Sequence, residues 1–267
     1  MIEPIDEETI KFLFEQIAKN RESPIEAESL YGFTPSIKKL PILKCKDGNK
    51  YVVKPQNEGK ANVNDQIVAR LGIALNAPVV QPAIINISSG LISQPELRNF
   101  NKGTTHGSKF IENCPKLYRI AKSDERGNLI SLANTLENRP RLALLAILFG
   151  WCFANDVQLM LVNNGRNLVH SVDYGNFFPG GPEWSIETLD SLKTSATPYD
   201  EFEFNLNPDE LKPALNALHE IDEHTIIRAI SIPPEDWRIS MEERIGLFHF
   251  LVKRKKEVLD SLTTLFI

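Results

Sequence analysis

Two aspartates stand on either side of one expected β-hairpin within residues 142–175. An apolar, helix-like run leads to Asp156, a short strand and a turn follow, and a second strand ends immediately before Asp173. Transfer of a phosphoryl group needs one carboxylate near the attacking hydroxyl and another that holds Mg²⁺ against the phosphates. The order of the two aspartates fits this chemistry, although aspartates at strand ends are also common turn residues.

The residues after the second aspartate favour a metal role for it. Asp173 is followed by Tyr174 and Gly175, and a glycine lets the backbone approach a ligand closely. Carboxylate oxygens are ligands that hard cations such as Mg²⁺ prefer. We therefore favour Asp173 as a metal ligand over a residue that only caps a turn.

A lysine and another acidic residue precede this hairpin. Lys54 ends a strand-like run over residues 51–54, from which its ammonium can reach nucleotide phosphates as a point charge. Asp65, in the first turn of an expected helix over residues 62–75, is the candidate partner of Lys54. The simpler alternative is a solvated lysine at a strand end and an aspartate that favours the amino terminus of a helix.

A loop over residues 31–36 is a weaker candidate for phosphate binding. Its backbone N–H groups and hydroxyls, including that of Ser36, could cover phosphates. The loop lacks the Gly-Lys-Ser/Thr sequence of a Walker A motif, and a single glycine in a polar loop is more often part of a turn.

The elements that must position these residues divide the chain into a strand-rich first part and a helix-rich second part. Periodicity and turn residues predict a helix over 10–18, a hairpin over 37–45 and 50–54, a helix over 62–75, a strand over 79–87, a short apolar stretch over 106–111, and helices over 208–220, 223–231 and 241–265. This order predicts an α+β, two-lobed architecture with a cleft near residues 109–114. We expect a helical extension over 1–30, a strand-rich lobe over 31–113 and a helical lobe over 114–267.

The composition excludes several other classes of protein. The chain has 267 residues, of which 42% are hydrophobic, and a net charge of −5, which argues against a dedicated nucleic-acid binder. No run approaches the length of a membrane span, and the acidic amino terminus lacks a signal-peptide pattern. The three cysteines are widely spaced, which argues against a disulfide framework or a structural zinc site. We expect a cytoplasmic protein.

In their order along the chain, these residues resemble the HipA-like kinase domain family, bacterial relatives of the HipA serine/threonine kinase. The resemblance covers roughly residues 30–265. Its segments are 47–54, 64–65, 68–72, 77–79, 106–110, 154–156, 172–178, 232–237 and the helix that contains Arg254.

The resemblance implies a two-lobed kinase fold, MgATP as cosubstrate and transfer of the γ-phosphate to a hydroxyl of a protein or a small molecule. By position, Lys54 would hold the phosphates, Asp65 would orient Lys54, Asp156 would position or deprotonate the acceptor hydroxyl, and Asp173 would coordinate Mg²⁺. The backbone of three residues at the hinge would meet the adenine: Phe110, Ile111 and Glu112.

The loop after the first aspartate departs from the family pattern. The family has a metal-binding asparagine after the catalytic aspartate, but the loop after Asp156 is shorter and Leu159 fills the expected position. Gln158 and Asn163 are the candidates to replace this ligand, and we assign the metal role to Gln158. Loss of one metal ligand weakens the organisation of Mg²⁺ around the γ-phosphate, on which this catalysis depends.

Three hypotheses follow. The first is a HipA-like kinase with ATP, Mg²⁺ and an unknown acceptor as its partners. The second is a pseudokinase, a nucleotide- or protein-binding module without turnover, which the short loop after Asp156 favours. The third is an α+β protein whose site lies elsewhere and whose aspartates only cap turns.

Overall fold

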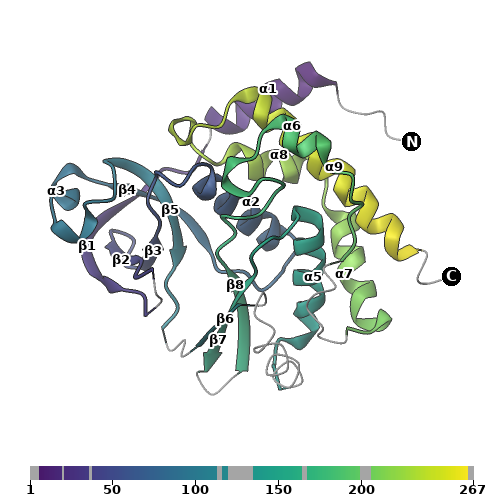
Figure 1. Ribbon diagram of the computed structural model, residues 1–267, viewed down its shortest axis with the longest axis horizontal. Helices are drawn as coiled ribbons and strands as arrows, with labels where there is room; N and C mark the ends of the chain where they lie inside the picture. The colour runs from purple at the N-terminus through teal and green to yellow at the C-terminus, as the bar shows by residue number, and fades with distance from the viewer. Residues whose placement is uncertain are drawn as a thin grey trace.

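A computed structural model describes residues 6–19, 21–35, 38–112, 116–119, 135–163, 167–198 and 206–263. A strand-rich part lies on one side of the molecule and most helices lie on the other, with helix α2 (Ala61–Ala74) between them (Figure 1). This arrangement confirms the predicted α+β fold class. Ser36 and the expected lobe boundary between residues 113 and 114 lie outside the described residues.

Five strands close into a barrel with the order β1-β2-β3-β5-β4. They are β1 (Ile25–Phe33), β2 (Pro41–Cys45), β3 (Lys50–Val53), β4 (Pro82–Ile87) and β5 (Gly103–Lys109). Strands β1 and β4 are parallel, and the other neighbours are antiparallel. The barrel has its own apolar core, which includes Leu43, Val53 and Ile85. Gly48, at φ 80°, lies in the turn of the predicted hairpin between β2 and β3.

Strand β1 was not predicted, because its sequence lacks the apolar alternation of a half-buried strand. None of its residues is fully buried, and it is held by pairing with β2 and β4. It runs across the expected boundary at residue 30 and contains Tyr31, Gly32 and Phe33, which we expected in a loop. Of the described residues of the candidate phosphate loop, only Thr34 and Pro35 therefore lie outside a strand.

A second, three-stranded antiparallel sheet carries the two aspartates. Its order is β6 (Lys116–Arg119), β7 (Gln158–Asn163) and β8 (Asn167–Val172), and β6 was not predicted. Gln158 pairs with Val172, so the chain enters β7 and leaves β8 at the same end of the hairpin. This register places Asp156 and Asp173 together at that end.

The helical part is built around α5 (Leu142–Cys152), all of whose residues are buried. A helix that is apolar on every side belongs in a core, and α2, α7 and α9 pack against it. The other helices are α3 (Ser89–Ile92), α6 (Ile186–Ser191), α7 (Pro208–Glu220), α8 (Glu223–Ser231) and α9 (Met241–Thr263), together with the 3₁₀ turns Pro95–Leu97, Arg139–Arg141, Gly181–Glu183 and Glu235–Trp237. The observed bounds of α7 and α8 equal the predicted ones.

The amino-terminal helix α1 (Glu7–Lys19) packs against α8 and α9. Ile10 and Phe14 are buried there, whereas Phe12 is 56% exposed. Part of the apolar stripe predicted over this segment therefore packs against the helical part of the molecule. Among the described residues, no helix has the length and apolar character needed to cross a membrane.

Candidate active site

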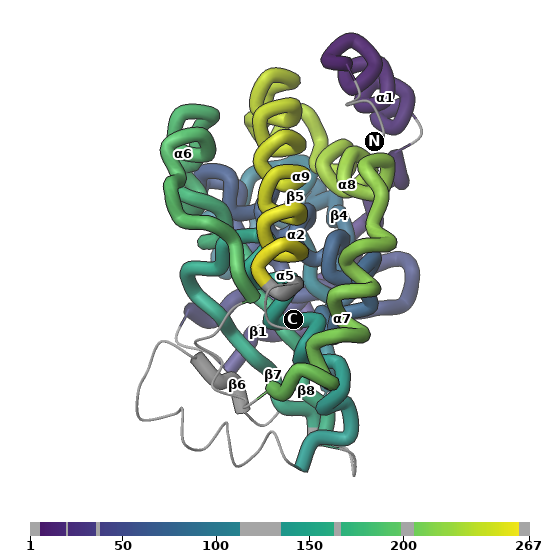
Figure 2. Tube along the Cα trace, turned by 90° about the vertical axis from the view of Figure 1, so that its right-hand side faces the viewer, coloured from purple at the N-terminus to yellow at the C-terminus, as the bar shows by residue number. Residues whose placement is uncertain are grey.

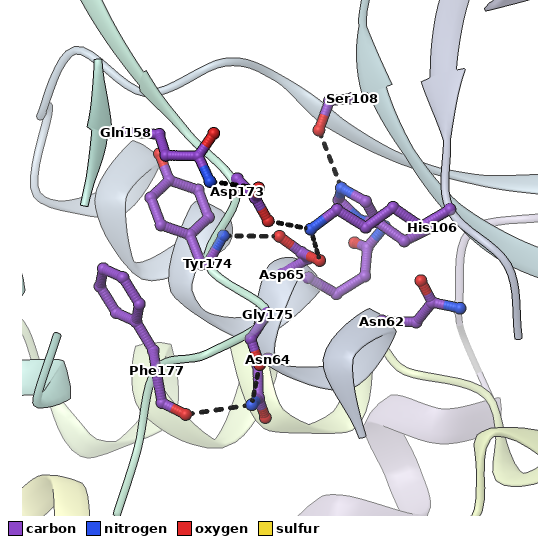
Figure 3. Close-up of polar contacts among 12 residues, drawn as sticks. Asn62, Asn64, Asp65, His106, Ser108, Gln158, Asp173, Tyr174, Gly175 and Phe177 are labelled. Atoms are coloured by element: carbon purple, nitrogen blue, oxygen red, sulfur yellow. Dashed lines mark hydrogen bonds and ion pairs between the residues drawn. The ribbon is translucent and has the colours of Figure 1, made fainter. Parts of the chain in front are cut away.

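The centre of the site is the buried ammonium of Lys54, which lies between two carboxylates. Its Nζ atom lies 2.6 Å from Oδ2 of Asp65 and 2.5 Å from Oδ1 of Asp173. Figure 3 shows the side chains of Asp65 and Asp173 close together at this centre. Lys54 follows strand β3 and Asp65 lies in the second turn of α2, so the barrel and the helix bring these two residues together. Asp173 directly follows β8. The structure thus joins three residues that the sequence placed far apart.

The three charges shift one another's pKa values. Burial alone would lower the pKa of Lys54, but the two carboxylates outweigh this effect and raise it. Burial would likewise raise the pKa of Asp173, but the ammonium of Lys54 outweighs it and holds that pKa below its usual value. Lys54 and Asp173 are therefore charged at neutral pH. Burial raises the pKa of Asp65 to about 6, against the attraction of Lys54.

We expect the Asp65 carboxyl to titrate near pH 6 and its pKa to rise further in Lys54→Met, because that variant removes the attraction that opposes burial. A raised pKa means that the folded chain takes up this proton before the unfolded chain does. This carboxyl therefore adds stability as the pH falls from 6 towards 3.8, the usual value for an aspartic acid.

The check is ¹³C NMR of the aspartate side chains, with Asp65→Asn to assign the signal. Asp190, an exposed residue of α6, provides the reference signal. An Asp65 pKa that falls in Lys54→Met would contradict the assignment of the ion pair.

The backbone at Asp173 adopts an unusual conformation. Its φ is 64°, in the left-handed region that few residues other than glycine, asparagine and aspartate enter. Strained backbone of this kind clusters at functional sites, where the surrounding structure maintains it. Here the backbone N–H of Tyr174 donates to Oδ1 of Asp65 over 2.7 Å, which fixes the strand end against α2.

Gln158 links the two aspartates of the hairpin. Its Nε2 atom lies 2.6 Å from Oδ2 of Asp173 and 3.4 Å from Oδ2 of Asp156. Leu159, at the position where the family pattern has asparagine, is fully buried in the apolar core. The amide next to the Asp173 carboxylate therefore comes from Gln158, whereas the side chain of Asn163 lies outside the described residues.

The donor set fits Mg²⁺ that is shared with a nucleotide. Among the described residues, no group of three or more His, Cys, Asp or Glu side chains could hold a metal ion alone. Mg²⁺ in phosphoryl-transfer sites commonly takes one or two protein carboxylates and completes its shell with phosphates and water. Asp173, whose side chain is 26% exposed, can supply one carboxylate. Gln158 can supply an amide oxygen once its amide, whose Nε2 atom faces Asp173, turns over.

Sequence reasoning missed the residue that holds the Asp173 segment in place. Asn64 is fully buried, and its Nδ2 atom lies within 2.9–3.1 Å of the carbonyl oxygens of residues 175, 177 and 181. Its Oδ1 atom accepts a hydrogen bond of 2.8 Å from the indole N–H of Trp184. Asn64 entered the sequence analysis only as the neighbour of Asp65 within the family resemblance, without a role of its own.

Hydrogen bonds from Arg254 and Asn155 hold the loop that precedes Asp156. Arg254, on α9, donates from Nε to the carbonyl of Trp151 and from Nη2 to that of Gly150, over 2.9 and 2.5 Å. These carbonyls lie at the end of α5, where a helix leaves acceptors without partners of its own. On the other side of the loop, Asn155 donates to the carbonyls of residues 176 and 178.

The expected adenine contacts lie at the other end of β3 from Lys54. Phe110 donates its backbone N–H to the carbonyl of Lys50, and Glu112 forms an exposed ion pair of 2.8 Å with the Lys50 side chain. Ile111, the residue between Phe110 and Glu112, is partly buried. No described hydrogen bond or ion pair connects residues 110–112 to the cluster around Lys54.

The fold and the site place the chain among proteins with a protein-kinase-like fold. It is similar to the proinflammatory kinase CtkA of Helicobacter pylori, with a TM-score of 0.57 and 13% identity over 91% of this chain and 97% of that one. At this identity the likeness shows the fold alone. No protein-family model and no curated protein sequence matches the chain significantly.

Two further solved structures are more distant. The Golgi casein kinase with Mn and ADP bound aligns with a TM-score of 0.42 and 11% identity over 96% of this chain and 77% of that one. HipA of Shewanella oneidensis, in a complex with HipB and operator DNA, gives the same TM-score and identity over 75% of this chain and 57% of that one.

Proposed function

We propose that this protein is a MgATP-dependent kinase of HipA-like type that transfers the γ-phosphoryl group to a hydroxyl of a protein or a small molecule. The observation that carries the proposal is the buried Lys54 between Asp65 and Asp173 on a protein-kinase-like fold. A buried cation held between two carboxylates is pre-oriented, and catalysis of phosphoryl transfer depends mainly on positioning and on charge stabilisation.

Each residue of the site has a role in this proposal. Lys54 binds the nucleotide phosphates, and Asp65 keeps its ammonium in place when Asp173 turns to the metal. Asp173 and Gln158 would hold Mg²⁺, which supplies positive charge to the phosphates when bound. Asp156 accepts or orients the proton of the attacking hydroxyl. Residues 31–113 would form the lobe that binds adenine at residues 110–112, and residues 114–267 the lobe that binds the acceptor.

The roles predict that Asp156→Asn lowers phosphoryl transfer by about 10²–10⁴-fold, the usual contribution of a general base, while MgATP binding remains. Asparagine keeps the size of the side chain, and among the described residues it is Gln158 that links Asp156 to Asp173. The measurement is release of labelled γ-phosphate to water or to a generic protein acceptor, with calorimetry for binding.

Asp190→Asn is the matched control, because it makes the same change on an exposed face of α6. The assignment of Asp156 fails if both variants transfer phosphate at the wild-type rate.

A pseudokinase is the second candidate, and one observation favours it. Leu159 is buried where the kinase pattern has a second metal ligand, so that position cannot contact Mg²⁺. The same experiment separates the two candidates. Wild-type protein that binds MgATP without any transfer that depends on Asp156 is a nucleotide-binding module.

A further inference from the structure

A cavity of about 290 Å³ lies between α1 and the beginning of α9, away from the Lys54 cluster. In Figure 2, α1 sits beside α8 and α9 at one end of the molecule. Its lining combines apolar side chains, those of Phe14, Ile239 and Met241, with polar ones, those of Arg21, Ser231 and Arg244. The volume is at the lower end of the roughly 300–1,000 Å³ that is usual for small-molecule sites.

Two arginines line the cavity. Among the described residues, no carboxylate lies within ion-pair distance of Arg21 or Arg244. Arg244 is buried, with 5% of its surface exposed. Its Nη1 and Nη2 atoms donate to the carbonyls of Ile230 and Pro233. The Nε atom of Arg21 is buried and has no hydrogen-bond partner.

A structural role explains only part of this arrangement. The two carbonyls partly compensate the charge of Arg244, because they lie at and just beyond the carboxyl end of α8. They do nothing for Arg21, and a buried donor without a partner is costly. Burial and then the charge of Arg21 lower the pKa of Arg244 to about 10, against the attraction of Glu235 and Glu243.

The nearby acidic residues do not neutralise the pair. Glu243 is engaged by Lys60 over 2.7 Å and by the backbone N–H of Ser240 over 2.9 Å. Glu235 lines the cavity but is exposed to solvent. The amino terminus of α9, which begins at Met241, adds the positive end of a long helix to the same space.

We propose that the cavity formed by α1, the end of α8 and the beginning of α9 binds a small anion, a carboxylate or a phosphate monoester, attached to a compact apolar group. The anionic group would accept hydrogen bonds from Arg21 and lie near Arg244, and the apolar group would contact Phe14 and Met241. A planar guanidinium suits carboxylate and phosphate alike. This proposal does not depend on the proposed kinase activity.

The test is calorimetric titration of the whole protein with benzoate, phenyl phosphate and inorganic phosphate, with benzyl alcohol and benzylamine as neutral and cationic probes. We expect saturable binding of benzoate or phenyl phosphate that is about tenfold weaker or lost in Arg21→Met, since a hydrogen bond to a charged group is removed. Met241→Trp, which fills the apolar part of the cavity without changing charge, should have the same effect.

Lys19→Met is the matched control, because it removes one exposed positive charge from the last turn of α1. It should leave binding of the probes unchanged, and MgATP binding should be the same in all three variants. Each of the following results would overturn the proposal: no saturable binding of either aromatic anion to the wild type, equal binding to Arg21→Met, or equal binding of benzyl alcohol. Inorganic phosphate that binds as tightly as phenyl phosphate would also overturn it, because the apolar side chains would then contribute nothing.

Discussion

Asp173→Asn is expected to abolish Mg²⁺-dependent nucleotide binding and to lower phosphoryl transfer by about 10³-fold, the scale of losing one preorganised charge contact. Asparagine has nearly the same size and tolerates φ near 64°, so the strand end keeps its conformation. It lacks the charge that a hard cation requires. Lys54 retains Asp65 as its partner, so the variant should remain folded.

Calorimetric titration of ATP with and without Mg²⁺ measures this effect, and Asp190→Asn again controls for the loss of one negative charge. The wild type should bind ATP more tightly with Mg²⁺ than without it, and Asp173→Asn should lose the difference. If Mg²⁺ tightens binding equally in both proteins, Asp173 is not the metal ligand.

Asn64→Leu is expected to reduce the free energy of unfolding by about 4 kcal/mol, because it leaves several buried polar groups without partners at about 1–3 kcal/mol each. Leucine has a similar volume but cannot bond the carbonyls of residues 175, 177 and 181 or the indole of Trp184. The segment after Asp173 would also lose its anchor to α2, so MgATP binding should weaken in the folded fraction.

Urea denaturation followed by tryptophan fluorescence gives the free energy. Asn101→Leu makes the same exchange at an exposed side chain and should change stability by no more than about 0.5 kcal/mol. Equal effects of the two substitutions would show that the buried bonds of Asn64 contribute little.

The elements with strong periodicity could be predicted from the sequence, and those that depend on partners could not. Helices α7 and α8 and the hairpin of β7 and β8 carry clear apolar patterns, and their observed positions agree with the predicted ones. Strand β1 has no buried residue, and its backbone is extended because β2 and β4 pair with it. Pairing of this kind depends on segments far away in the sequence, and the local pattern of residues does not indicate it.

The same distinction holds for the site. Residue type and order singled out Lys54, Asp65 and Asp173, and the structure places their charged groups in contact. The supporting residues could not be found in this way. Asn64 is one asparagine among many in the sequence, and its importance depends on four partners that lie more than a hundred residues away.

The bonds from Arg254 to the end of α5 also bear on the time at which the site forms during synthesis. Arg254 follows Trp151 by 103 residues, so the ribosome must translate nearly all of the described chain before this guanidinium is available. Nascent protein released before that point would contain every residue of the Lys54 cluster and of the hairpin, yet would lack the group that holds the end of α5. These bonds at the end of α5 can therefore form only after α9 has been translated.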